Sequence, residues 1–169
     1  MTLAPGSGQG PPKGPPPLTP FGLKLHHDGV FSHEGEPIGN RRLREHFDRS
    51  VEYLADKEKF IVRLKHFRGE IVVQEAGFFV RAVDLDSGEI HLSDGTREAL
   101  DLSTLAESPI DGALLCRVKR DLVSAGLLAR FLHGPQAELL QAVELDGDCL
   151  FVEIAGRREP MPEPAVLGD

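Results

Sequence analysis

The chain has 169 residues, of which 40% are hydrophobic, and a formal net charge of −8 at pH 7. This length predicts one domain, or two half-size units that share a core. Because an acidic surface is repelled by phosphate backbones, and because no stretch approaches the roughly 18–20 apolar residues of a membrane helix, we expect neither nucleic acid nor a membrane as a partner.

The N-terminal segment, residues 1–20, is rich in proline and glycine. It holds seven prolines and four glycines and has almost no apolar side chains to bury, so the entropy cost of ordering it is not offset. We predict a disordered tail with some polyproline II character. The PxxP spacing of residues 12–15 is expected by chance in so proline-rich a segment. At the other end, residues 162–169 are predicted to be a frayed tail.

An N-terminal half is predicted over residues 21–107. Alternating apolar residues predict strands on either side of an Asp-Gly turn at 28–29. Apolar residues then recur at helical spacing and predict a helix over 40–55. Short strands separated by turn residues predict an antiparallel meander over 60–102. The stripe that predicts the helix consists of Leu43, Phe47, Val51 and Leu54.

A C-terminal half is predicted over residues 108–161. Its elements are a strand at 113–118, a segment at 122–132 that is either strand or helix, a helix over 135–144 and closing strands. The predicted fold class is therefore α+β, with two similar strand–helix–strand halves, mostly antiparallel sheets and one main helix per half.

The segments that lead into the two predicted helices are similar. Phe31–Pro37 and Phe131–Pro135 each combine the end of a strand, a break that contains His, Gly and Pro, and the start of a helix. This similarity suggests an internal repeat whose two halves meet near residues 103–112. Chance similarity between two strand–turn–helix units is the alternative.

Patterns typical of a catalytic or metal centre are missing from the sequence. The seven histidines form no H-x-x-x-H or H-E-x-x-H pair, and no C-x-x-C accompanies them. We therefore predict no catalytic residue, no metal and no cofactor. The alternative is a hydrolase or transferase that uses His33 or His133 with a nearby acid. Cys116 and Cys149 lie in apolar alternating stretches and are predicted to be buried thiols, and with no export signal we expect a cytoplasmic location.

Charge is unevenly distributed along the chain. Residues 41–68 hold nine Lys/Arg against five Asp/Glu, whereas residues 69–111 hold only Arg81 and Arg97 against ten Asp/Glu. The folded domain could therefore have a basic side and an acidic side. Two ordinary solvated faces are the alternative.

The candidate binding surface combines a basic helical turn with a break between strands. Three arginines in one turn concentrate positive potential in an otherwise acidic protein, which suits a small anionic ligand or an acidic protein partner. At the break, a glycine and two adjacent phenylalanines could form an apolar pocket wall. This surface predicts a non-enzymatic binding or regulatory module, and a solvated helix face beside a packed core strand is the alternative. The candidate residues are Arg41, Arg42, Arg44, Glu75, Gly77, Phe78 and Phe79.

Residues 23–155 resemble a bacterial family of uncharacterised proteins, domain-of-unknown-function family 1285. The resemblance lies in the order and spacing of several short segments rather than in one motif. The first segments are Leu23–Phe31 with its Asp-Gly turn, and Gly35-Glu36-Pro37-Ile38 with Leu43…Phe47, which is similar to the family's G-x-P-I-x-R-x-x-L…F. The strand at 60–62 follows, and Val73–Phe78 stands in place of the family's V-E-D-A-P-F. The last segment is Gly126–Phe131 followed by 138–140, which is similar to the family's G-L-x-A-R and a helix.

The chain departs from this family at specific positions. Phe31 stands where the family usually has Trp, Gln74-Glu75 stands where it has Glu-Asp, and Gly77 stands where it has Pro. The resemblance implies a fold of repeated strand–helix motifs. It also implies a suspected regulatory or signalling role, with no established ligand or reaction.

Overall fold

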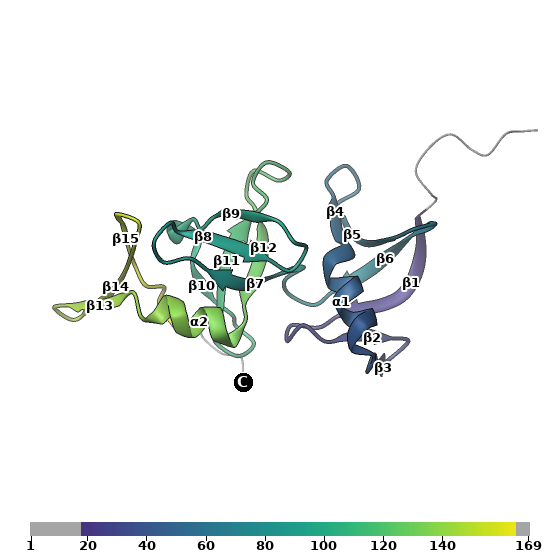
Figure 1. Ribbon diagram of the computed structural model, residues 1–169, viewed down its shortest axis with the longest axis horizontal. Coiled ribbons are helices and arrows are strands. Elements are labelled where there is room, and N and C mark those ends of the chain that lie inside the picture. The colour runs from purple at the N-terminus through teal and green to yellow at the C-terminus, as the bar shows by residue number, and fades with distance from the viewer. Residues whose placement is uncertain (1–17, 165–169) are drawn as a thin grey trace, which may run out of the picture.

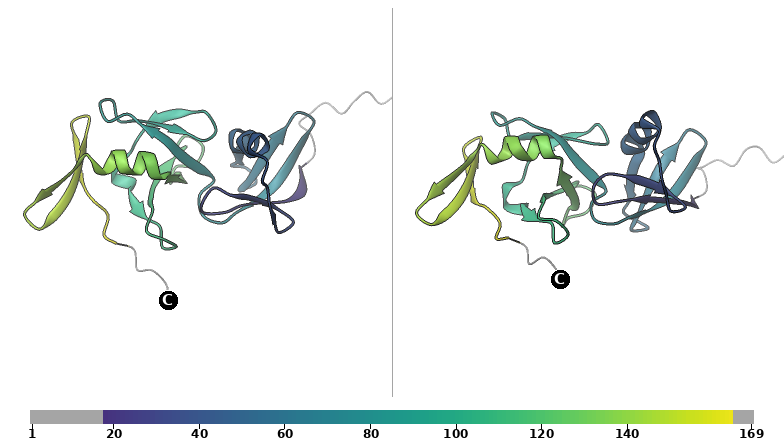
Figure 2. Two further views of the ribbon diagram at one scale, coloured as in Figure 1. Left: turned by 60° about the horizontal axis from the view of Figure 1, so that its bottom comes forward. Right: turned by 90° about the horizontal axis from the view of Figure 1, so that it is seen from below.

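The computed structural model describes residues 18–164 and has the predicted α+β class. This part of the chain forms two six-stranded sheets, a small third sheet and two α-helices (Figure 1). Along the long axis of the molecule the order is first sheet, second sheet, third sheet (Figure 2). The predicted tails at 1–17 and 165–169 lie outside the described residues, and none of the described helices is long and apolar enough to cross a membrane.

The first sheet and its helix form the first unit, residues 18–73. The strand order is β3-β2-β1-β6-β5-β4, and all neighbouring strands are antiparallel except β1 and β6. The helix α1 lies between β3 and β4 in the chain and buries Phe47 against Phe31, with 5.7 Å between the ring centroids. The elements are β1 Leu18–Leu25, β2 Phe31–His33, β3 Glu36–Pro37, α1 Arg41–Ser50, β4 Val51–Leu54, β5 Lys59–Leu64 and β6 Phe67–Val73.

The second sheet forms the second unit together with the helix that follows it. The strand order is β10-β11-β12-β7-β8-β9, and here too one central pair, β7 and β12, is parallel. A short 3-10 helix, η1, stands between β9 and β10 where the first unit has α1. The elements are β7 Phe78–Val83, β8 Glu89–Leu92, β9 Arg97–Ala99, η1 Leu102–Thr104, β10 Ala106–Glu107, β11 Leu114–Val118, β12 Leu127–Phe131 and α2 His133–Leu140.

The two sheets have the same topology. Each consists of two three-stranded antiparallel meanders that lie side by side. The strands that join the two meanders are the first and the sixth of the unit in chain order, and they run parallel to each other in the middle of the sheet. The segment 74–77 connects the units, so they meet there and not near 103–112. The meander expected over 60–102 is divided between the two sheets, because Gln74–Gly77 interrupts it after β6.

The similar helix lead-ins do not occupy equivalent positions in this topology. Phe31 begins β2, the second strand of the first sheet, whereas Phe131 ends β12, the sixth strand of the second sheet. The internal repeat that these lead-ins suggested therefore does not describe how the sheets correspond.

Both main helices are shorter than the sequence pattern predicted. The side chain of Asn40 accepts a hydrogen bond from the Leu43 N–H and caps α1, which ends at Ser50 instead of residue 55. Val51 is extended and pairs with Val62, because β-branched and aromatic residues at 51–54 favour a strand. Likewise α2 covers 133–140 rather than 135–144, and 143–146 forms a strand.

The third sheet consists of β13 Val143–Asp146, β14 Cys149–Ile154 and β15 Arg157–Pro160. Val152 and Ile154 are buried and belong to the same apolar core as both large sheets. Cys116 is buried, as predicted, and burial raises the pKa of its thiol to about 12. Cys149 is exposed, contrary to the prediction, because β14 begins outside the core at the tip of this hairpin.

Candidate functional site

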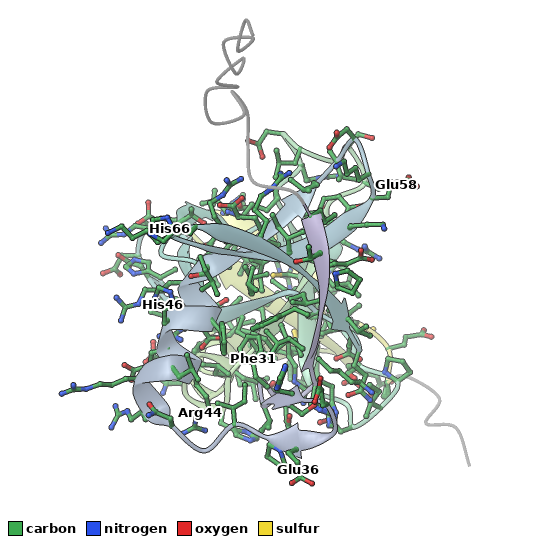
Figure 3. All side chains as sticks on the ribbon, turned by 90° about the vertical axis from the view of Figure 1, so that its right-hand side faces the viewer. Phe31, Glu36, Arg44, His46, Glu58 and His66 are labelled. Carbon is green, nitrogen blue, oxygen red and sulfur yellow. The ribbon has the colours of Figure 1, made fainter. Side chains whose placement is uncertain are left out.

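The three arginines predicted to bind a ligand lie in the first turn of α1 and differ in exposure. Arg41 is 84% exposed and pairs with Glu45 one turn along the helix, and Arg42 is also exposed. Arg44 is half-buried, and its Nε has no hydrogen-bond partner among the described residues. Figure 3 shows Arg44 and His46 at the rim of the first unit, whereas Phe31 lies in its middle.

The predicted residues of the strand break are not beside those arginines. Gly77, Phe78 and Phe79 are buried, and a Cβ atom at Gly77 would lie 2.3 Å from a ring carbon of Phe60. Glycine is therefore required here by close packing between the units, and the two phenylalanines belong to the core.

Glu75 takes part in a buried hydrogen-bonded network. Its carboxylate accepts hydrogen bonds from the Ser108 hydroxyl at 2.6 Å and from Arg130 Nη1 at 3.1 Å, and Arg130 Nη2 also donates to Asp111. Burial lowers the pKa of Arg130, but hydrogen bonds to Asp111 and Glu75 outweigh it and the pKa is raised. The hydrogen bond from Arg130 also lowers the pKa of Asp111. The network links the segment 74–77, which connects the units, to β12. The ionic groups of the network are already paired with one another.

Three pockets lie along the seam where the two units pack. Each takes at least one lining residue from the first unit and the others from the second. The first, of about 250 Å³, lies beside Arg130 and is also lined by Asp28, Asp111 and His133. Another, of about 280 Å³, lies between β4 and the β11–β12 connection, where Lys119 pairs with Asp94 at 2.7 Å.

The remaining pocket, of about 270 Å³, is the most basic of the three, and we call it the basic pocket. It is lined by one arginine from each of α1, β7 and β9, a histidine from β8 and four uncharged residues. These residues are Arg49, Arg81, Arg97 and His91, with Ala82, Leu92, Ser93 and Gly95. No aspartate or glutamate is among them.

Two carboxylates beside the basic pocket compensate part of its charge. Asp48 accepts a hydrogen bond from Arg81 at 2.6 Å, and burial raises the pKa of this carboxyl despite the nearby arginines. Glu89 lies 3.9 Å from Arg97, a distance beyond direct hydrogen bonding. Arg49 forms no ion pair with any residue in the described part of the chain. An uncompensated guanidinium thus remains available to a ligand.

The two histidines of the enzymatic alternative have different surroundings. The ring of His33 packs on Phe21, with 5.3 Å between ring centroids, and the residue is exposed. His133 is exposed at the start of α2 and lines the pocket beside Arg130. Within residues 18–164 no group of three or more His, Cys, Asp or Glu is placed to hold a metal ion.

The sequence contained a signal for part of the basic pocket. Arg81 and Arg97 are the only lysine or arginine residues between 69 and 111, which makes them conspicuous in an acidic segment. Their proximity to Arg49 could not be inferred, because it depends on packing between the two units. Arg130 is a single charged residue in an otherwise apolar strand, and the sequence alone does not identify its partners Glu75 and Asp111.

Comparison with known proteins identifies the fold. Neither a family model nor a curated protein sequence matches the chain. Among solved structures, a DUF1285 family protein from Silicibacter pomeroyi is similar with a TM-score of 0.60 and 18% identity, over 87% of this chain and 83% of that one. A DUF1285 family protein from Shewanella baltica has a TM-score of 0.47 and 12% identity, over 72% of this chain and 91% of that one.

The class that the fold defines is a two-sheet α+β domain with pockets along the seam between its units. More specifically, the chain has a DUF1285-like fold, as the resemblance read from the sequence implied. At 18% identity this similarity concerns the fold, and the DUF1285 name assigns no function.

Proposed function

We propose that the chain is a non-enzymatic binding module that takes a small anionic ligand in the basic pocket. One observation carries this proposal. Three arginines and a histidine, drawn from both units, line one cavity of about 270 Å³ in a chain whose net charge is −8. Concentrating positive charge in a concave site of an acidic protein favours an anion there over elsewhere on the surface.

The geometry of the arginines supports a ligand with several acceptor oxygens. A guanidinium presents donors in a planar fork that matches carboxylate or phosphate oxygens. Arg49 has its whole fork available, and the long separation between Arg97 and Glu89 leaves donors of Arg97 available as well. Arg81 is held in place by Asp48.

The position of the pocket supports a regulatory use of binding. Arg49 belongs to the first unit, whereas Arg81, His91 and Arg97 belong to the second. A ligand that contacts both sides stabilises the packed arrangement of the units over any arrangement that separates them. Such a module could signal the presence of its ligand to a protein partner, in a bacterial cytoplasm where the two thiols stay unpaired.

Thermal unfolding of the full chain in the presence of small anions tests the proposal. At a concentration one hundred times Kd, a ligand of the folded state should raise the Tm by roughly 5–10 °C. Arg49→Gln, if it weakens binding about tenfold, should reduce the shift to about half or less. Arg42→Gln is the matched control, because it removes the same charge from the same helix outside the pocket.

Ionic strength is held constant with sodium chloride, so that general screening is not mistaken for binding. A shift of equal size in both variants would refute the basic pocket as the site. A different outcome is that no small anion changes the Tm of the wild-type chain, while the wild-type chain captures an acidic protein and Arg49→Gln does not. The ligand would then be a protein partner instead of a small anion.

An enzymatic role has one supporting observation. His133 lines a pocket together with Asp28 and Asp111, so an imidazole and carboxylates share one cavity. We keep a hydrolase or transferase at this pocket as the second candidate. Loss of an activity in His133→Gln but not in His33→Gln would support it, since His33 lies beside Phe21 instead.

A further inference from the structure

We infer that the ligand of the basic pocket is a small phosphomonoester, held by its phosphate group, rather than a carboxylic acid. This inference rests on the proposed function above. The chemical class of the anion is indicated by the number of arginines, the separate elements from which they come and the uncharged residues in the rest of the pocket lining.

The basic pocket has donor groups from three guanidiniums. Arg49, Arg81 and Arg97 come from three separate elements, α1, β7 and β9. A carboxylate has two oxygens in one plane and is satisfied by a single guanidinium fork. A phosphate monoester presents three terminal oxygens in three directions, so it can accept hydrogen bonds from arginines that approach from different elements.

Positive charge exceeds negative charge at the basic pocket. Asp48 compensates Arg81, and Glu89 compensates Arg97 only in part, while Arg49 is uncompensated in the described part of the chain. Three guanidiniums against two carboxylates leave an excess of about one positive charge at the pocket, and the donors of Arg49 and Arg97 are largely unused. The same Glu89 lies 3.6 Å from the Nε2 of His91. A phosphomonoester, with a charge of about −1.5 to −2 at pH 7, is attracted more strongly by this excess than a monocarboxylate is.

The rest of the pocket lining is uncharged. Ala82, Leu92, Ser93 and Gly95 are small or uncharged, and the Ser93 hydroxyl accepts a hydrogen bond from the Phe79 N–H at 2.9 Å. These residues leave space for an uncharged organic part beside the phosphate. A volume of about 270 Å³ lies just under the range of roughly 300–1,000 Å³ found for drug-sized ligands, so the organic part is small, such as a short polyol.

The pocket beside Arg130 does not offer the same chemistry. Arg130 is already shared between Glu75 and Asp111, and Asp28 adds another carboxylate to that cavity. The pocket at Lys119 likewise pairs its cation with Asp94 and contains Glu52. A phosphate would meet like charges in both places.

Isothermal titration of the full chain tests the inference with glycerol 3-phosphate, glycerate and inorganic phosphate at about pH 7.5 and constant ionic strength. We expect glycerol 3-phosphate to bind about tenfold more tightly than glycerate, since additional charge-assisted hydrogen bonds form. Inorganic phosphate should bind more weakly than the ester, because it leaves the uncharged part of the pocket unfilled.

Variants assign the binding to the pocket. Arg49→Gln and Arg97→Gln should each weaken glycerol 3-phosphate about tenfold or more, whereas Arg42→Gln should leave its affinity unchanged. Arg97→Lys keeps the charge but loses the fork, so its affinity should fall between wild type and Arg97→Gln. Arg49 and Arg97 are exposed, so these variants are expected to stay folded, which circular dichroism verifies.

The outcomes separate this inference from the proposed function. If glycerate binds as tightly as glycerol 3-phosphate and both are lost in Arg49→Gln, the phosphate class is wrong and the anion site stands. If inorganic phosphate binds as tightly as the ester, the small organic part is wrong. If none of the three binds at millimolar concentration, the inference is overturned for this class, and only thermal shifts with other anions could sustain the proposed function.

Discussion

Arg130 Nη1 donates a hydrogen bond to the Glu75 carboxylate at 3.1 Å, and both side chains are more than nine-tenths buried. Glu75 lies in the segment that connects the units, and Arg130 lies on β12, a central strand of the second sheet. The Ser108 hydroxyl occupies the second carboxylate oxygen. The pair is most sensitive to loss of Arg130, because Glu75 would then be buried without a cation, whereas Arg130 would keep Asp111 as a partner if Glu75 were removed.

Replacing Arg130 by methionine should therefore destabilise the protein by about 3–5 kcal/mol, since Glu75 then remains buried without a cation. Urea denaturation measures the change in the free energy of unfolding. Arg63→Met is the control: Arg63 pairs with Glu52 at the surface, where both side chains are over 40% exposed, and the cost should be below about 1 kcal/mol. A double variant, Arg130→Met with Glu75→Leu, should recover part of the loss. Equal costs for the two single variants would show that the Arg130 pair is not special.

Gly77→Ala should destabilise the packing between the units. The new Cβ would lie 2.3 Å from a ring carbon of Phe60, so the ring or the backbone has to move, and overpacking of this kind costs about 1–3 kcal/mol. At Gly134, in α2, an added Cβ meets nothing within 4 Å, so Gly134→Ala should be neutral or stabilising by up to about 1 kcal/mol. Thermal unfolding compares the two. A Tm for Gly77→Ala at or above that of wild type would contradict this account of the close approach.

Local patterns were sufficient to predict much of this fold from the sequence. Alternation of apolar residues located most strands, and the Asn40 cap with the buried Phe47 marks a real helix. The helix predicted from the sequence was too long because Val51 and Leu54 continue the helical spacing of apolar residues, although they also suit a strand. Pairing with β5 favours the strand over the helix at residues 51–54. This pairing is a tertiary interaction, so the local spacing of apolar residues does not indicate it.

The candidate site was less accessible to the same reasoning. The prediction of an arginine site counted charges within one helical turn, whereas the basic pocket combines Arg49, Arg81 and Arg97 across the seam. The adjacent aromatics at 78–79 were predicted to form an apolar pocket wall; both are buried in the core, and Phe78 also lines the pocket at Lys119. A pattern along one strand cannot show what covers its second face, because the neighbouring unit does so here.

Stability at low pH should depend on Asp94. Although burial raises the pKa of this carboxyl, hydrogen bonds from Lys119 and Thr96 outweigh it, and the pKa lies below its usual 3.8. A carboxyl with a lowered pKa in the folded state contributes stability above its unfolded pKa and loses that contribution as the pH falls through the folded value. Asp94→Asn should thus be destabilising at pH 7 and progressively less so below about pH 3.8, as urea denaturation at a series of pH values can show. A cost independent of pH would mean that the charge of Asp94 is not what stabilises Lys119.

The two cysteines should differ sharply in reactivity. Cys149 is exposed on the third sheet, whereas Cys116 is fully buried on β11, where burial raises the pKa of its thiol to about 12. Alkylation proceeds through the thiolate, so Cys116 is protected both by its low thiolate fraction and by the lack of access. Iodoacetamide should therefore modify one thiol per native chain and two per chain unfolded in urea, as intact-mass spectrometry can count. Cys149→Ser should abolish native labelling and Cys116→Ala should preserve it. Rapid native labelling of Cys149→Ser would instead show that the second unit opens at β11 on the time scale of the reaction.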